Sequence, residues 1–275
     1  RQCKVVMVLA NNAKSHANTL RVRRALETLW SVPLKNLNEY QIKRDSELWP
    51  YHKFEDNSII GENGVSVYFR NLEEKLIGHI KEANSVFGAV AWLTNTPILE
   101  AMSDKEHVQI IVQKEEFLKP DSKITNKADF KVKLREHYSK LKCSIFRGEF
   151  EEWLLSLTIM CSDGNTDNIE PVRCVGANNK YKKSAFPRMH NKFLIFANVE
   201  VVDDCGYPVN VIKPYAVWTG SFNFSYNATN SLENALYITD KKIVDAYFKE
   251  YSQIATMSEP LDWSKDWVSP EWVLG

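Results

Sequence analysis

The chain has 275 residues, of which 44% are hydrophobic and 25% are charged, and its 35 Lys and Arg side chains balance 35 Asp and Glu side chains. This composition is typical of a globular protein with one large domain, or with one domain and an appendage. The zero net charge excludes a uniformly basic nucleic-acid-binding surface but not a local basic patch. No run of about eighteen apolar residues occurs, so we expect no membrane-spanning helix.

Residues 1–60 contain an apolar strand pattern at 5–10, a helical stripe at 20–29 and a polar connection from residue 31 onward. They match no motif, and we interpret them as an N-terminal extension of unknown role.

Strand and helix patterns alternate after residue 61. The patterns predict strands at 65–69, 86–92, 108–112 and 143–146, and helices at 72–80 and 130–141. Asn71 is expected to cap the first helix, and Thr96 and Pro97 are expected to be the cap and first residue of another. This alternation is typical of an α/β layered sheet.

The second half of the chain begins with a polar segment, 162–185, which we interpret as a long loop. The patterns that follow predict a strand at 189–202, a turn at Gly206 and Pro208, strands at 216–219 and 236–238, and a helix over 243–251.

Five cysteines are spread along the chain without the close spacing of a zinc site or a disulfide framework. They are Cys3, Cys143, Cys161, Cys174 and Cys205. An odd number of unpaired thiols is typical of a reducing compartment. We therefore expect free cysteines and a cytoplasmic protein.

The most informative stretch begins with His190-Asn191-Lys192 at the start of a predicted strand. Side chains two apart on a strand point the same way, so His190 and Lys192 are expected side by side, about 7 Å apart by strand rise. An ammonium can neutralise a phosphate oxygen while an imidazole acts on phosphorus or on a proton. The pair therefore favours phosphate chemistry.

A second polar cluster follows the strand predicted at 216–219. Gly220 has no Cβ, which lets the backbone come close to a ligand. Ser221 and Asn223 are good caps for a helix expected to begin there, and a helix N-terminus favours an anion. The Ser221 hydroxyl and the Asn223 amide would add directed donors.

A carboxylate, Glu233, lies in the segment 230–234 just before the last predicted strand. It is expected to hold one imidazole nitrogen of His190 and to leave the other free to attack, which is the orienting role of the third group in nucleophilic sites.

The ordered set MHNKF (189–193), TGSFNFS (219–225) and NSLEN (230–234) resembles the phospholipase D superfamily, whose signature is His-x-Lys followed by Gly-Ser-x-Asn. The subgroup it is most similar to contains the small single-motif members, namely the bacterial Nuc-type endonucleases and the mitochondrial cardiolipin hydrolase or Zucchini type. Each motif alone is weak, whereas the ordered set is specific. The likeness extends over residues 65–254.

The resemblance implies a phospholipase D-like α/β fold, with a mixed central β-sheet flanked by helices. The domain division is then an extension at 1–60, a catalytic domain at 61–258 and a Trp-rich tail at 259–275.

The resemblance also implies a phosphodiesterase in which His190 forms a phosphohistidine intermediate. Lys192, Ser221 and Asn223 would bind the phosphate, and Glu233 would support the histidine. No metal ion or other cofactor takes part in that scheme.

Two features depart from the family pattern. Ala197 stands where the family usually has an Asp five residues after the lysine, and the spacer from Lys192 to Gly220 is longer than usual. The extra residues fit a hairpin around 206–208, which leaves both ends of the motif in place.

The implied mechanism needs a second histidine to protonate the leaving oxygen and then to activate water. His79-Ile80-Lys81 also reads His-x-Lys, but residues two apart on a helix do not face each other. The remaining candidates, with no phosphate-binding segment nearby, are His16, His52, His107 and His137. We therefore expect the second histidine to be His190 of another copy, across the axis of a homodimer.

Two substrate classes are left, nucleic acid and phospholipid. A basic run interleaved with aromatic residues precedes the motif and consists of Lys180, Lys182, Lys183 and Arg188. Such a run suits a nucleic-acid backbone and a stacked base, although a solvated loop has the same composition. A lipid hydrolase is expected to carry an anchor or an interfacial helix, and the sequence shows neither. We favour an endonuclease acting on DNA or RNA, with a phospholipase or cardiolipin hydrolase and an inactive binding scaffold as alternatives.

Overall fold

The structure is a computed structural model that describes residues 55–118, 128–145, 148–150, 170–176, 187–204, 206–261 and 263. By its contacts the chain divides into two units, Arg1–Glu55 and Asp56–Gly275, and every described helix and strand belongs to the second. The strand predicted at 5–10 and the helix predicted at 20–29 lie outside the described residues, as does the tail beyond 263.

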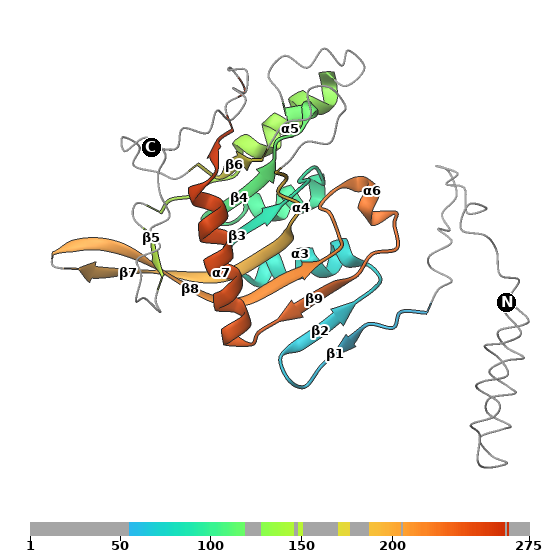
Figure 1. The fold of residues 1–275 in the computed structure, drawn as a ribbon, viewed down its shortest axis with the longest axis horizontal. Coiled ribbons are helices and arrows are strands. Elements are labelled where there is room, and N and C mark those ends of the chain that lie inside the picture. Colours follow the sequence, from blue (N-terminus) through green and yellow to red (C-terminus); the bar gives the residue numbers. More distant parts are fainter. Residues whose placement is uncertain are drawn as a thin grey trace, which may run out of the picture. The chain divides into compact units, whose positions relative to one another are not determined.

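A ten-stranded mixed sheet is the centre of the second unit (Figure 1). Its strands are β1 (Ile59–Ile60), β2 (Val65–Tyr68), β3 (Ser85–Val90), β4 (His107–Gln113), β5 (Gly148–Phe150), β6 (Val172–Val175), β7 (Lys192–Asp204), β8 (Tyr207–Gly220), β9 (Ala235–Ile238) and β10 (Glu259–Pro260). Nine of them follow the order β1-β2-β9-β8-β7-β3-β4-β6-β10, and β5 pairs with β8 off this path. The β3–β4 and β4–β6 pairs are parallel and the other pairs along the order are antiparallel.

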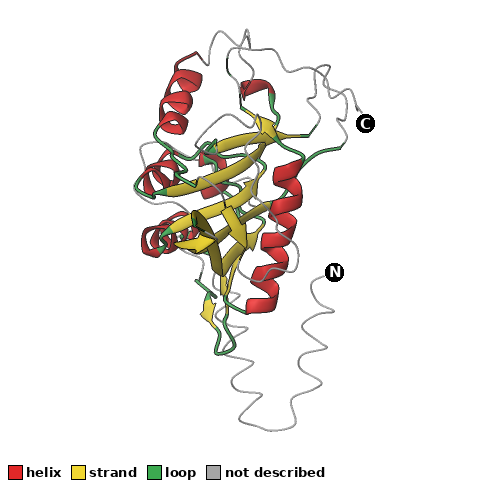
Figure 2. Cartoon of the chain, turned by 90° about the vertical axis from the view of Figure 1, so that its left-hand side faces the viewer, coloured by secondary structure: helices red, strands yellow, loops and turns green. Residues whose placement is uncertain are grey.

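Helices cover both faces of this sheet (Figure 2). They are α3 (Leu72–Glu82), α4 (Thr96–Ser103), α5 (Ala128–Ser139), the short α6 (Tyr226–Thr229) and α7 (Lys241–Thr256). Apolar residues of α3, α4 and α5 pack with Leu194 and Phe196 of β7 in one core, and those of α7 pack with Phe193 and Ile195 in the other. The α/β fold with a mixed sheet flanked by helices is therefore confirmed, and β7 is held from both faces.

The β7–β8 hairpin accounts for the long spacer between the two motifs. β7 and β8 pair out to Asp204 and Tyr207 with a register shift between Phe196 and Ala197, and Gly206 in the turn has a positive φ of 86°. The predicted turn is confirmed at Gly206, whereas Pro208 already belongs to β8 and pairs with Asp203. The tip of the hairpin extends beyond β3, whose pairing with β7 ends at Ala197 (Figure 1).

Two predicted helix caps differ from the observed ones. Asn71 does occupy the cap position of α3, but with a left-handed φ of 54° and without a hydrogen bond from its side chain. The cap of α4 is Asn95, whose side chain accepts from Ile98 N at 3.0 Å, so Thr96 and Pro97 are its first two helical residues. The shift by one residue arises because Asn95 is also a favourable capping residue.

Two strand predictions were wrong. Of the strand predicted at 143–146, the described part makes only an isolated bridge between Cys143 and His107. Conversely, β6 lies inside the segment 162–185 that was interpreted as a loop. It has four residues and includes the buried Arg173, so its apolar pattern is too short to identify a strand.

None of the described helices is both long and apolar enough to cross a membrane.

Candidate active site

Four strand ends meet at one edge of the sheet. β3 ends at Val90 opposite Lys192, the first residue of β7, and β8 ends at Gly220 opposite Ala235, the first residue of β9. Neighbouring antiparallel strands run in opposite directions, so the end of one lies beside the start of the next. The segments that carry the three motifs therefore leave the sheet at the same edge.

His190 and Lys192 are in direct contact at this edge. Lys192 Nζ lies 3.2 Å from His190 Nδ1 and 3.4 Å from Nε2, and it donates a hydrogen bond of 2.9 Å to the His190 carbonyl oxygen. Since β7 begins at Lys192, His190 lies just before the strand and not inside it, as the prediction over 189–202 had it. The imidazole is exposed and the lysine is partly buried.

An open pocket of about 460 Å³ adjoins this pair. Its lining consists of His190, Asn191, Lys192, Phe193, Thr219, Gly220, Ser221, Asn223, Tyr247 and Glu250. Tyr247 and Glu250 come from α7 and were not anticipated from the sequence. The only available signal was that Tyr247 belongs to the apolar stripe of the last predicted helix. Its hydroxyl contacts Thr219 Oγ1 at 3.3 Å.

Gly220 is needed for the approach of two strands. A Cβ at this position would lie 2.2 Å from the Asn234 carbonyl oxygen and 2.8 Å from the Ala235 Cα. These atoms belong to backbone, so no side-chain rotation relieves the clash. The close contact of β8 with the start of β9 is thus a structural reason for glycine at this position. Gly220 also lines the pocket, and the expectation that it makes room for a ligand stays a prediction.

Ser221 and Glu233 form a hydrogen bond. Ser221 Oγ donates to a Glu233 carboxylate oxygen and accepts from Asn234 N at 3.1 Å, while Ser221 N donates to Asn234 O at 3.1 Å. Among the described residues, the His190 ring nitrogens contact Lys192 and the Glu233 carboxylate contacts Ser221. The expected hydrogen bond from a His190 ring nitrogen to the Glu233 carboxylate is thus not found, and Glu233 acts electrostatically on Lys192 instead.

The helix expected directly after Gly220 begins later. α6 has four residues and is capped by Ser225, whose side chain accepts from Ala228 N. Ser221 and Asn223 are therefore not helix caps. The intervening chain is instead fixed to the loop after β3, because the Phe224 carbonyl accepts from Thr94 N at 2.7 Å and from Asn95 N at 2.9 Å. No phosphate-binding role is assigned to the α6 terminus.

Asn223 lines the pocket, and one polar atom of its side-chain amide has no partner in the part of the chain that the structure describes. Its Oδ1 is buried and has no hydrogen-bond partner among the described residues. Buried polar atoms are normally paired, and exceptions often mark a place where a ligand or water binds. Because Oδ1 accepts hydrogen bonds, it suits a donor on a ligand or a water, whereas the Nδ2 group is the donor that a phosphate oxygen would need.

The basic residues expected to bind substrate are only partly accounted for. Lys180, Lys182 and Lys183 lie outside the described residues. Arg188 is described, and its guanidinium forms an ion pair with Glu115.

The charges around the pocket lower the pKa of both members of the pair. Partial burial lowers the pKa of His190 below its usual 6.5, and repulsion by Lys192 and Arg188 lowers it further, against an opposing effect of Glu115. Burial also lowers the pKa of Lys192, with a contribution from Arg188, while Glu233 opposes the shift. These effects favour the neutral form of the imidazole, and the lowered pKa of Lys192 means that its charged form is disfavoured relative to a free lysine.

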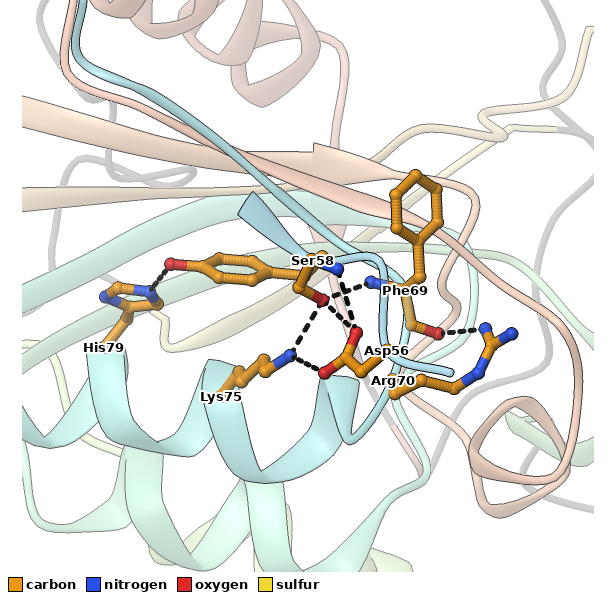
Figure 3. A network of polar contacts seen from close by, with 7 residues as sticks. Asp56, Ser58, Phe69, Arg70, Lys75 and His79 are labelled. Atoms are coloured by element: carbon orange, nitrogen blue, oxygen red, sulfur yellow. Dashed lines mark hydrogen bonds and ion pairs between the residues drawn. The ribbon is translucent and has the colours of Figure 1, made fainter. Parts of the chain in front are cut away.

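The second His-x-Lys sequence, at residues 79–81, belongs to α3 and takes part in a different set of contacts. His79 of α3 stacks on Tyr237 with ring centroids 3.9 Å apart, and its Nε2 lies 3.3 Å from the Tyr68 hydroxyl. Nearby, Lys75 donates to Asp56 and to Ser58, both at 2.9 Å (Figure 3). This network joins α3 to the segment before β1. His79 does not line the pocket, and neither do His107 and His137, whereas His16 and His52 lie outside the described residues.

Ala197 has a packing role. It is fully buried in the core that faces α7, and the pairing of β7 with β8 shifts between Phe196 and Ala197. Burying a carboxylate in this apolar position without a partner would destabilise the fold. The surrounding core therefore suits an alanine at position 197.

We expect the His190 imidazole to titrate with a pKa below 6.5, as measured by NMR. In Lys192→Met the pKa should rise, because the imidazolium form loses a repelling neighbour. Lys81→Met, in the other His-x-Lys sequence, is the matched control and should leave the value unchanged. An unshifted wild-type pKa, or equal values in wild type and Lys192→Met, would contradict this electrostatic picture.

Comparison with known proteins gives one relative of substantial identity. No family model matches the chain. Among solved structures, NucT from Helicobacter pylori is 18% identical with a TM-score of 0.39, covering 71% of this chain and 98% of that one. Nuc from Salmonella typhimurium, a phospholipase D family member, is 16% identical with a TM-score of 0.39, covering 74% and 98%. Scores at this level do not by themselves establish a relationship.

The uncharacterized protein L381 of Acanthamoeba polyphaga mimivirus is 34% identical over 218 residues, which are 75% of this chain and 70% of the viral protein. The chain therefore belongs to the same protein family as mimivirus protein L381.

Proposed function

We propose that the protein is a phosphodiesterase of the phospholipase D type, with His190 as its nucleophile. The observation that carries the proposal is the contact of the His190 imidazole with the Lys192 ammonium, beside a pocket that Ser221 and Asn223 also line. The order His-x-Lys then Gly-Ser-x-Asn is the order that the superfamily signature requires. A lone histidine at a sheet edge would not support this reading.

The proposed reaction has two displacements. A neutral His190 nitrogen attacks phosphorus, the bond from phosphorus to the leaving oxygen breaks, and an acid group protonates that oxygen. Water then attacks the phosphohistidine and gives up a proton to the group that protonated the leaving oxygen, which now acts as a base. The bond from phosphorus to the His190 nitrogen breaks, and His190 and the second product are released. Lys192 and Asn223 stabilise the phosphate oxygens, where charge develops in both steps. Ser221, held by Glu233, fixes the loop that carries Asn223.

Nucleic acid is the proposed substrate. Arg188 precedes the nucleophile by two residues, and the sequence places three further lysines at 180–183. Positive residues close in the sequence to a phosphodiesterase nucleophile suit a polyanionic backbone. Phospholipid hydrolysis and an inactive scaffold are outcomes that the same test distinguishes.

Four substrates should be tested separately in the presence of EDTA, namely single-stranded DNA, duplex DNA, RNA and cardiolipin. The proposal predicts cleavage of at least one of the three nucleic acids. His190→Ala should lose activity by at least about 10²-fold, since the attacking group is removed. Lys192→Ala and Asn223→Ala should each lose about 10²–10³-fold, as when a donor to a developing negative charge is removed.

Lys81→Ala controls for a change of charge outside the pocket and should keep wild-type activity. Cleavage of cardiolipin alone would identify the protein as a lipid hydrolase. Full activity in His190→Ala would remove the nucleophile, and inactivity on all four substrates would favour the scaffold.

We further propose that the acid group is His190 of the partner subunit in a two-fold homodimer. The described histidines of the same chain other than His190 lie outside the pocket, so the part of one copy that the structure describes supplies one imidazole there. Specific activity should then fall on dilution in parallel with dimer dissociation, measured by sedimentation. Undiminished activity of a strict monomer at nanomolar concentration would rule out the shared site.

A further inference from the structure

Glu115, just beyond the C-terminal end of β4, contacts two side chains that flank the proposed nucleophile. Its Oε1 accepts a hydrogen bond of 3.0 Å from Trp92 Nε1 and also pairs with the Arg188 guanidinium. Trp92 follows β3, and Arg188 precedes β7. One carboxylate therefore joins three segments at the edge of the sheet where the pocket opens.

Trp92 reaches His190 directly. The centroids of the two rings are 6.1 Å apart and their planes are inclined by 89°, an edge-to-face contact. Lys192 contacts the same imidazole through Nζ. The exposed His190 side chain is thus held between an indole and an ammonium, and Glu115 holds the indole by its N–H group.

The backbone before His190 is fixed from the same strand. Gln113, the last residue of β4, is buried, and its Oε1 accepts from Met189 N at 2.7 Å. Glu115, two residues further, pairs with Arg188. The end of β4 therefore fixes both residues that precede His190, Met189 through its backbone N–H and Arg188 through its side chain.

We propose that Glu115 is a positioning residue for His190, acting through Trp92 and Arg188. The proposal rests on His190 being the nucleophile. A carboxylate that only stabilised the fold through an exposed ion pair would contribute little, and Arg188 and Glu115 have exposed fractions of 36% and 21%. Its shared bond to the Trp92 N–H, beside the reacting imidazole, favours a role in orientation.

The pKa of His190 gives a second, independent measure of the effect of Glu115. The charged groups acting on His190 are Lys192 of β7 and Arg188, which lower its pKa, and Glu115, which raises it. Neutralising Glu115 removes the opposing effect. The pKa of His190 should therefore fall, and the acidic limb of the pH–rate profile should move to lower pH.

The test is Glu115→Gln in the full chain, which keeps an oxygen acceptor for Trp92 but loses the charge that pairs with Arg188. Trp92→Phe complements it by keeping an aromatic ring while removing the N–H donor. Glu106→Gln is the matched control, because Glu106 is an exposed carboxylate immediately before the opposite end of β4.

For Glu115→Gln we expect kcat to fall by about 10–10²-fold, the range over which small misplacement of a reacting group acts, with KM changed less. Trp92→Phe should lower kcat in the same direction. The NMR-measured pKa of His190 should fall in Glu115→Gln and stay unchanged in Glu106→Gln.

An unchanged pKa of His190 in Glu115→Gln overturns the proposal, whatever happens to kcat. So does a loss of activity in Glu115→Gln and Trp92→Phe that only parallels a loss of folded protein in thermal denaturation. The NMR readout needs no turnover. Full activity in His190→Ala would therefore reject the proposed nucleophile separately from the contact that Glu115 makes.

Discussion

The antiparallel register of β3, β7, β8 and β9 brings the ends of these strands to one edge of the sheet, and this places the contacting pair His190 and Lys192 beside Gly220 and Ser221. Lys192 lies opposite Val90, and Gly220 lies opposite Ala235. A slip of one residue would turn each side chain of a strand to the other face. The two cores that hold β7, one against α3–α5 and one against α7, oppose such a slip.

Electrostatics then sets the protonation state at that edge. Partial burial and two positive neighbours favour the neutral form of His190. Burial also lowers the pKa of Lys192, against the opposing effect of Glu233. A neutral imidazole has a lone pair for attack, and an adjacent ammonium attracts a phosphate diester. The same arrangement would be poorly suited to a protonated histidine, because two positive groups in contact repel each other.

Two groups of residues lie on either side of His190 at this edge of the sheet, one for the proposed reaction and one for the positioning role of Glu115. Lys192, Ser221 and Asn223 line the pocket on the side of β7 and β8. Trp92, Glu115 and Arg188 lie on the side of β3 and β4. His190 is between these two groups, so small changes on either side should alter its orientation.

Local patterns in the sequence predicted much of this arrangement. The alternation of strand residues anticipated the His190–Lys192 contact, and continuous apolar runs identified β3 and β4. The loop after Gly220 was misread because Ser221 and Asn223 suit turns as well as caps, and only the pairing of Phe224 with the loop after β3 decides between them. The Glu115 contacts were not foreseeable by local pattern, since Glu115 and Arg188 are 73 residues apart. Such contacts depend on how distant strands pair in the sheet, and no short spacing of residues in the sequence predicts them.

The central claim, attack by His190 on phosphorus, is tested most directly by the stereochemistry of cleavage. A dinucleotide with a single chiral phosphorothioate linkage would be hydrolysed in ¹⁸O-labelled water, and the configuration of the product at phosphorus determined. Two successive in-line displacements through phosphohistidine predict net retention of configuration. Net inversion would show that water attacks the diester in one step, and would contradict the account.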